Sequence, residues 1–101
     1  MLFFFVRGDY VTVDQKENGD ITVTCSNPHR LPYCQWQRES LPGQFEDLTD
    51  REKDKYKNRG SQMMTIKSFT FADRGSYRCK CHDRTKKYQY SSSMTIGNFL
   101  Q

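Results

Sequence analysis

The sequence predicts an all-β fold, and two observations carry that prediction. Segments such as residues 21–25 alternate apolar with polar side chains and are rich in β-branched types, which is typical of half-buried strands. No segment has the 3.6-residue periodicity of an amphipathic helix. The expected strands, in chain order, cover residues 10–13, 21–25, 33–38, 44–48, a short piece near Tyr56, 63–69, 75–81 and 88–96.

The segments between these strands carry turn and loop signals. Asn18 and Gly19 form an Asn-Gly pair between the first two strands. Pro28 and Pro32 exclude residues 26–32 from a central strand, because proline cannot donate to the hydrogen-bond ladder. Residues 49–57 are almost wholly charged and indicate a solvated loop. A shortened region is therefore expected between the fourth strand and the strand near Tyr56.

A chain of 101 residues is expected to form one domain, spanning 1–101 with its core in 9–97. A domain of this size buries only about two-thirds of its unfolded surface, so cross-links would add useful stability. Four cysteines in so short a chain favour an oxidising compartment. The sequence therefore predicts an extracellular protein.

The charge balance favours acidic partners. Sixteen Lys and Arg residues stand against twelve Asp and Glu residues, for a net charge of +4. Nucleic acid is not expected among those partners, because the sequence has no basic helix, zinc-finger spacing or aromatic nucleic-acid-binding motif.

Cys25, Trp36 and the run Asp-Arg-Gly-Ser-Tyr-Arg-Cys at 73–79 together resemble the V set of immunoglobulin domains. The resemblance implies an immunoglobulin-like, V-type antiparallel β-sandwich with a shortened C′/C″ region. It also implies that Trp36 packs on a Cys25–Cys79 bridge and that Tyr77 makes a tyrosine-corner hydrogen bond. Asp73 would pair with a basic residue beside the strand near Tyr56. The candidates for that residue are Lys55, Lys57 and Arg59.

Cys34 and Cys81 are a further pair of cysteines. Side chains alternate along a strand, so Cys34 shares a face with Trp36, and Cys81 shares one with Cys79. If Trp36 lies level with Cys79, these offsets bring the two additional sulfurs together and predict a second disulfide. Two alternatives remain, namely two buried free thiols and a zinc site that includes His29 or His82.

No enzyme activity, cofactor or resident metal is expected. His29 and His82 fall in or beside predicted loops, and neither has a marked serine or cysteine nucleophile nearby. The loops at one end of such a sandwich usually bind partners, because a rigid core holds them out.

Within the V set, three details are most similar to the alpha chain of the cytotoxic T-cell co-receptor. They are Cys34 two positions before the tryptophan, a third loop ending at Tyr88, and a last strand, 93–96, without a Phe-Gly-x-Gly bulge. The resemblance implies a homodimer that binds major histocompatibility class I molecules through its loops. The binding residues it implies are His29, Arg30, Arg84, Lys86 and Lys87.

The resemblance places the dimer face on the sheet that contains Gln37 and Phe45. The same face would carry Arg78 and Lys80, whose charges need an acidic neighbour to offset them. The acidic candidates are Glu39, Glu46 and Asp47.

Other leukocyte receptors with an additional disulfide in a V-like domain form the alternative class. They include the myeloid triggering receptors, the polymeric immunoglobulin receptor family and the signalling subunits of the B-cell receptor. A secreted or viral decoy with the same fold is a third possibility.

Residues 1–6 are too short for a secretory leader, and no stretch reaches the roughly 20 apolar residues of a membrane span. We therefore expect a mature ectodomain on the extracellular side of the plasma membrane, tethered by an anchor outside this sequence.

Overall fold

The computed structural model describes residues 11–15, 18–27, 30–48 and 54–97. Its strands are β1 (Val11–Gln15), β2 (Ile21–Cys25), β3 (Tyr33–Leu41), β4 (Gln44–Asp47), β5 (Tyr56–Lys57), β6 (Met63–Ile66), β7 (Gly75–His82), β8 (Tyr88–Tyr90) and β9 (Met94–Ile96). One turn of 3-10 helix, η2 (Phe71–Asp73), precedes β7 and is too short to produce a periodic sequence pattern. The predicted all-β fold is confirmed.

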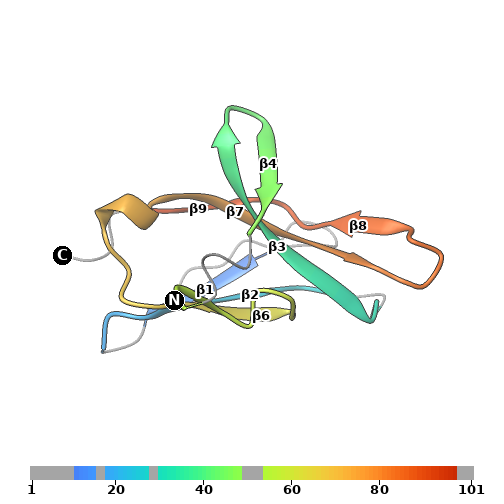
Figure 1. Ribbon diagram of the computed structural model, residues 1–101, viewed down its shortest axis with the longest axis horizontal. Helices are drawn as coiled ribbons and strands as arrows, with labels where there is room; N and C mark the ends of the chain where they lie inside the picture. Colours follow the sequence, from blue (N-terminus) through green and yellow to red (C-terminus); the bar gives the residue numbers. More distant parts are fainter. Residues whose placement is uncertain (1–10, 16–17, 28–29, 49–53, 98–101) are drawn as a thin grey trace.

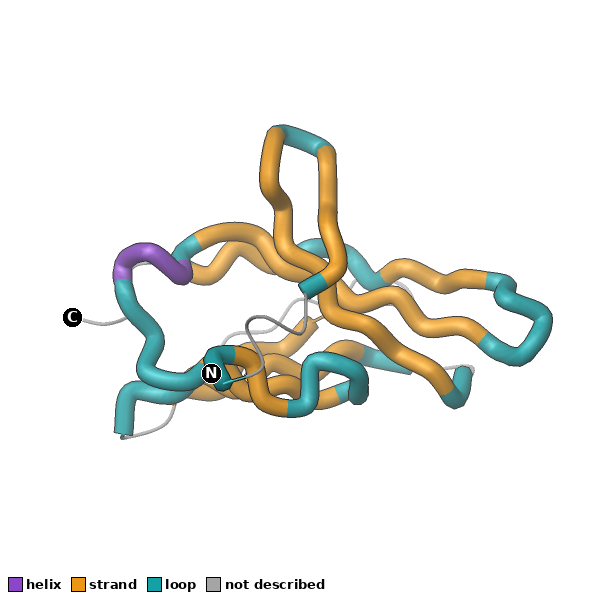
Figure 2. The backbone as a smooth tube through the Cα atoms, in the orientation of Figure 1, coloured by secondary structure: helices purple, strands orange, loops and turns teal. Residues whose placement is uncertain are grey.

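The strands form two antiparallel sheets packed as layers (Figures 1 and 2). One sheet has the order β1-β2-β6-β5, and the other has the order β4-β3-β7-β8, with β9 also paired to β7. Figure 2 shows the β3–β4 hairpin standing out from the two layers. The predicted immunoglobulin-like sandwich is confirmed.

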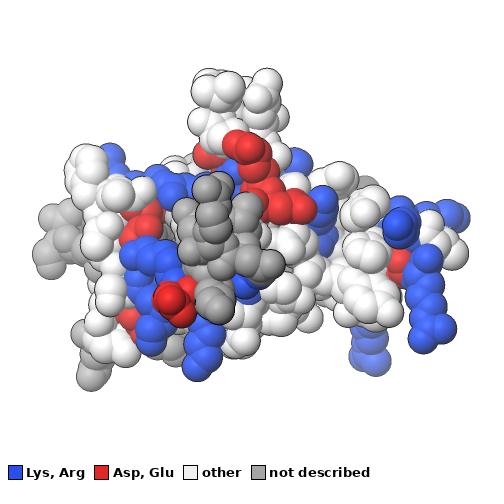
Figure 3. Space-filling view, viewed as in Figure 1, with Lys and Arg blue, Asp and Glu red and all other residues white. Residues whose placement is uncertain are grey.

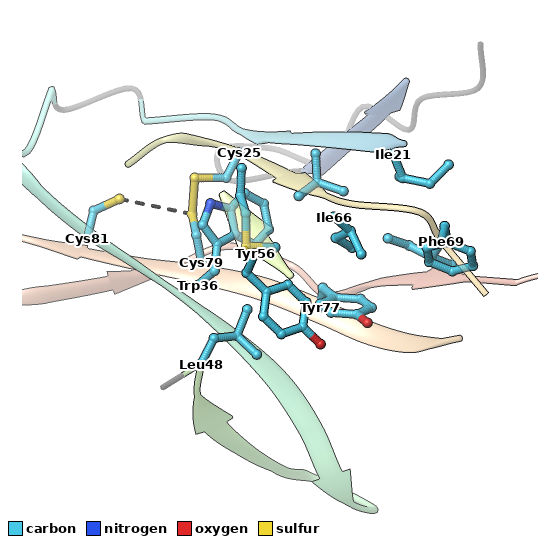
Figure 4. Close-up of a cluster of buried hydrophobic side chains, with 13 residues drawn as sticks. Ile21, Cys25, Trp36, Leu48, Tyr56, Ile66, Phe69, Tyr77, Cys79 and Cys81 are labelled. Atoms are coloured by element: carbon cyan, nitrogen blue, oxygen red, sulfur yellow. Dashed lines mark hydrogen bonds between the residues drawn. A yellow bond between two sulfur atoms is a disulfide. The ribbon is translucent and has the colours of Figure 1, made fainter. Parts of the chain in front are cut away.

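The core lies between the layers around Trp36, which is fully buried. Cys25 of β2 and Cys79 of β7 form a disulfide that joins the two sheets, and Figure 4 shows the indole beside it. The indole Nε1 donates a hydrogen bond to the Ser61 carbonyl oxygen over 2.8 Å, so its polar atom is satisfied despite burial. Truncating a buried side chain of this size typically costs about 3–5 kcal/mol.

The buried carboxylate of Asp73 joins η2 to neighbouring parts of the chain at one end of the sandwich. Asp73 accepts hydrogen bonds from the Thr70 amide over 2.8 Å and pairs with Lys55 Nζ at 2.7 Å. Lys55 is one of the three basic residues that the sequence offers as a partner for Asp73. The Tyr77 hydroxyl donates to the Asp73 carbonyl oxygen over 2.5 Å, which is the tyrosine-corner contact. Burial raises the pKa of Tyr77 above its ordinary value, which keeps this hydroxyl protonated.

Two strand boundaries differ from the sequence prediction. β3 continues past Arg38 to Leu41, because β4 pairs with it beyond the end of its pairing with β7. β6 stops at Ile66 rather than at residue 69. There, Ser68 has a positive φ of 46°, and its amide donates to Asp20 Oδ1 over 2.8 Å instead of to a strand.

The last strand, predicted as a continuous segment over 88–96, is interrupted. β8 pairs with residues 80–82 and β9 with 75–77, so the chain holds one more residue than its partner between them. The buried Ser91 fills this bulge. Its amide donates to the Cys79 carbonyl, and its Oγ accepts from the Cys79 amide, both over 2.9 Å. The Ser91 hydroxyl therefore takes the place of a backbone carbonyl as the acceptor for the Cys79 amide.

Candidate functional site

A second disulfide joins the strands that carry the candidate site. Cys34 of β3 and Cys81 of β7 are direct register partners, and their sulfurs are bonded. The Cys81 sulfur lies 4.0 Å from that of Cys79, so the two bridges are neighbours (Figure 4). The sulfurs of Cys25, Cys79 and Cys81 cluster closely enough to suggest a metal site. All three are oxidised to disulfides, however, and offer no thiolate to a metal ion.

The first candidate surface, which we call the loop end, comprises Arg30 and residues 83–87. Tyr33 is the register partner of His82, so the loops before β3 and after β7 leave the sandwich at the same end. Arg30 is exposed and has a positive φ of 51°. Its amide donates to the Asn27 carbonyl over 2.9 Å. His29, predicted as a binding residue, lies outside the described residues.

The turn after β7 is organised by one carboxylate. Asp83 Oδ1 accepts hydrogen bonds from the Thr85 amide over 2.8 Å and from the Thr85 hydroxyl, and the Lys86 amide donates to the Asp83 carbonyl over 3.0 Å. The Thr85 hydrogen bonds lower the pKa of Asp83 below its ordinary value. Arg84, Lys86 and Lys87 are exposed around this fixed turn.

The loop end is therefore strongly positive within the described part of the chain. Its described residues include four exposed cations and a single carboxylate, Asp83. In Figure 3, lysine and arginine side chains project from the end of the molecule at which the β7–β8 turn lies. Such a charge favours an acidic partner surface and raises its rate of association.

The second candidate surface, which we call the outer face, is the solvent side of the sheet β4-β3-β7-β8. Its side chains alternate along each strand with buried residues such as Trp36 and Cys79. The described residues that form it include Tyr33, Gln35, Gln37, Glu39, Phe45, Asp47, Ser76, Arg78, Lys80, His82, Tyr88, Tyr90 and Thr95. Gln37 is itself buried on this face, and the others are partly or fully exposed.

Aromatic rings and cations interleave across the outer face. The Arg78 guanidinium lies 4.1 Å from the centroid of the Phe45 ring and 4.5 Å from that of Tyr90. Lys80 Nζ lies 5.2 Å from the Tyr88 ring centroid and pairs with Asp47 Oδ1 at 3.2 Å. Each exposed cation–π contact of this type is worth about 0.5–1 kcal/mol. The cations are therefore held in place rather than left free.

A set of aromatic rings in contact with one another extends the outer face towards the loop end. The His82 ring lies 5.2 Å from that of Tyr33 and 4.9 Å from that of Tyr88. Tyr33, Tyr88 and Tyr90 are 47%, 43% and 48% exposed. Tyrosine and arginine are enriched at protein–protein interfaces, so this surface has the composition of a docking face.

The sequence prediction named Gln37 and Phe45 on this face but missed its tyrosines and His82. Strand alternation alone could have found them, because Tyr33 lies four positions before Gln37, and both therefore point the same way. Their ring contacts depend on the register between β3, β7 and β8, which the sequence does not state.

A comparison with protein-family models matches residues 11–96 to the family described as "Immunoglobulin domain". The match covers most of the chain, which therefore belongs to the immunoglobulin domain family. Domains of this family are typical of extracellular proteins, generally lack enzyme activity and serve as recognition modules at cell surfaces. No curated protein matches the chain. None of the helices in the described residues has the length and apolar character needed to cross a membrane.

Proposed function

We propose that this immunoglobulin domain is the recognition domain of a leukocyte surface receptor, and specifically of a T-cell co-receptor. It forms a homodimer through the outer face and binds major histocompatibility class I molecules through the loop end. It works on the extracellular side of the plasma membrane.

The observation that carries the ligand proposal is the fixed turn at Asp83. A loop that is already ordered loses little conformational entropy on binding. The three cations of this turn, Arg84, Lys86 and Lys87, are exposed, and Arg30 leaves the sandwich at the same end. This arrangement suits a projecting acidic loop on a protein partner.

The outer face supports the homodimer. The like charges of Arg78 and Lys80 would oppose the pairing of two copies if both were unscreened. Lys80 is paired with Asp47, and Arg78 lies between two aromatic rings and bonds Gln37. The ion pair with Asp47 offsets the charge of Lys80, whereas the contacts of Arg78 hold its side chain in place without neutralising it.

The ligand proposal is tested by surface plasmon resonance against purified class I ectodomains. Lys86→Glu and Lys87→Glu, made singly and together, should weaken binding by about fivefold or more for the pair, mainly through slower association. The melting temperature should hardly change, because both side chains are exposed. Lys57→Glu is the control, since Lys57 is an exposed cation on the other sheet. Unaltered affinity in the double variant would remove this turn from the binding site.

The second candidate is another leukocyte receptor of the V-like type, and the Cys34–Cys81 disulfide favours it. An additional bridge of this kind also occurs in the myeloid triggering and polymeric immunoglobulin receptor classes and in the B-cell receptor signalling subunits. A domain that stays monomeric at high concentration and does not bind class I ectodomains would favour this candidate over the co-receptor.

A further inference from the structure

The outer face contains a row of three side chains, and the order of the row is acid, amide, cation. Gln37 of β3 is the register partner of both Asp47 on β4 and Arg78 on β7. Gln37 Nε2 donates to Asp47 Oδ1 over 2.9 Å, and Gln37 Oε1 accepts from Arg78 Nε over 2.8 Å. The row therefore runs across three neighbouring strands with Gln37 at its centre.

We propose that this row is the centre of an isologous interface, in which Arg78 of each copy pairs with Asp47 of the partner subunit. Two sheets that pack face to face can be related by a two-fold axis lying in the plane between them. An axis parallel to β3 and above Gln37 exchanges the two sides of β3. It therefore places β4 of one copy over β7 of the other, and each cation meets an acid.

The alternative axis is excluded by charge. A two-fold axis that lies in the same plane but runs across the strands places β4 over β4 and β7 over β7. Asp47 would then face the partner's Asp47, and Arg78 would face the partner's Arg78. Like charges opposed across an interface cost several kcal/mol, so the row selects the axis parallel to the strands.

Both charged groups of the row have capacity for a second partner. The Asp47 side chain is 51% exposed, and within the described residues both of its contacts use Oδ1, which leaves Oδ2 for another donor. Among the contacts of the described residues, the hydrogen bond of Arg78 with Gln37 uses Nε, which leaves the two terminal nitrogens of the guanidinium for an acceptor. Phe45 and Tyr90 fix its position, which lowers the entropy lost on pairing.

The charge of the surface as a whole agrees with a second copy as the occupant. The outer face of β3, β4 and β7 carries the cations Arg78 and Lys80 and the acids Asp47 and Glu39. Two copies of a face with equal numbers of opposite charges do not repel each other overall. A strongly acidic or basic partner would gain little electrostatic attraction from such a face. The exposed aromatic rings beside the row would exclude water from the paired charges.

This inference rests on the proposed homodimer, and a charge-exchange experiment separates the two. Arg78→Asp makes both cross-subunit pairs acidic, and Asp47→Arg makes both basic. Each variant alone should dimerise at least tenfold more weakly than the natural protein in sedimentation equilibrium. An equal mixture of the two should form a dimer with one copy of each, because both cross-subunit pairs are then of opposite charge. The chain with both changes should also dimerise with itself.

Matched controls carry the same charge changes elsewhere. Glu46→Arg alters the neighbour of Asp47 whose side chain lies on the other side of β4, and Lys57→Asp alters an exposed cation of the other sheet. Both should dimerise like the natural protein. Circular dichroism confirms that each variant is folded, and native mass spectrometry with one tagged variant identifies the mixed dimer.

Each outcome decides one of the two claims. A natural protein that stays monomeric at high concentration overturns the homodimer itself. If the natural protein dimerises and the single variants dimerise equally well, the interface lies elsewhere, and the proposal that the row of Asp47, Gln37 and Arg78 is its centre is wrong. Single variants that lose the dimer, without recovery on mixing, show that the face is used but that Arg78 and the partner's Asp47 are not paired.

Discussion

The two disulfides lie too close together to constrain the unfolded chain independently. Nine positions separate Cys25 from Cys34, and two separate Cys79 from Cys81. With one bridge intact, the other closes a loop of roughly eleven residues instead of the full separation of 54 or 47. The chain-entropy relation gives about 2.8 kcal/mol for the short loop and about 4 kcal/mol for either long one.

Replacing one pair of cysteines by alanine should therefore lower the free energy of unfolding by about 2.8 kcal/mol, apart from the packing of the lost sulfurs. Replacing all four should lower it by about 7 kcal/mol, which exceeds the sum of the two pairs by about 1.4 kcal/mol. This excess is measured by urea unfolding of the natural protein, the two variants that lack one bridge and the variant that lacks both. Unfolding is followed by Trp36 fluorescence, with the same concentration of a stabilising osmolyte in every sample. Additive losses, within about 0.5 kcal/mol, would refute the reasoning that the bridges share one loop.

Two further predictions concern the bulge and the turn of the last strand region. Ser91→Ala leaves the buried Cys79 amide unpaired and should lower the free energy of unfolding by about 1–3 kcal/mol. Ser92→Ala, at an exposed position, should change it by less than about 0.5 kcal/mol. Equal effects of the two variants in urea unfolding would show that the Ser91 hydroxyl does not serve as the acceptor for the Cys79 amide. The folded-state pKa of Asp83 lies below the ordinary value of 3.8, so its stabilisation of the turn is complete above that pH and is lost as the pH falls through the lower, folded-state pKa. An NMR titration of the Asp83 carboxyl should give a midpoint below 3.8, and a midpoint at or above 3.8 would contradict the hydrogen bonds from Thr85.

Local alternation in the sequence is enough to predict the strands and which residues share a face, and the resemblance to V-set domains supplies the arrangement of the strands in two layers. Apolar and polar residues alternate in β2, where Ile21, Val23 and Cys25 are buried. The two-residue offsets of Cys34 from Trp36 and of Cys81 from Cys79 place the second bridge once β3 and β7 are taken as neighbours.

The interruption of the last strand could not be predicted in the same way. Residues 91–93 are three serines, which have no apolar alternation to mark a bulge. Only the structure shows that the Ser91 hydroxyl, unlike that of its neighbour Ser92, reaches the Cys79 amide. A side chain that replaces a backbone group leaves no periodic signal in the sequence.

The candidate site could be predicted only in part. The cations of the turn after β7 are visible in the sequence, but the Asp83 hydrogen bonds that fix the turn depend on its backbone path. The row of Asp47, Gln37 and Arg78 depends on two strand registers at once. Pairing register is set by turn geometry and by the packing of the whole sheet, so Arg78, which lies 41 positions after Gln37, cannot be aligned with it from local pattern.

The most direct test of the recognition account is an NMR dilution series of the natural protein. Amide shifts recorded from micromolar to millimolar concentration should change along β3, β4 and β7, with Gln37, Phe45 and Arg78 among the largest changes. The amides of Thr22 and Thr65, on the other sheet, should hold their positions. Spectra that do not depend on concentration, or changes centred on β2 and β6, would contradict a homodimer built on the outer face.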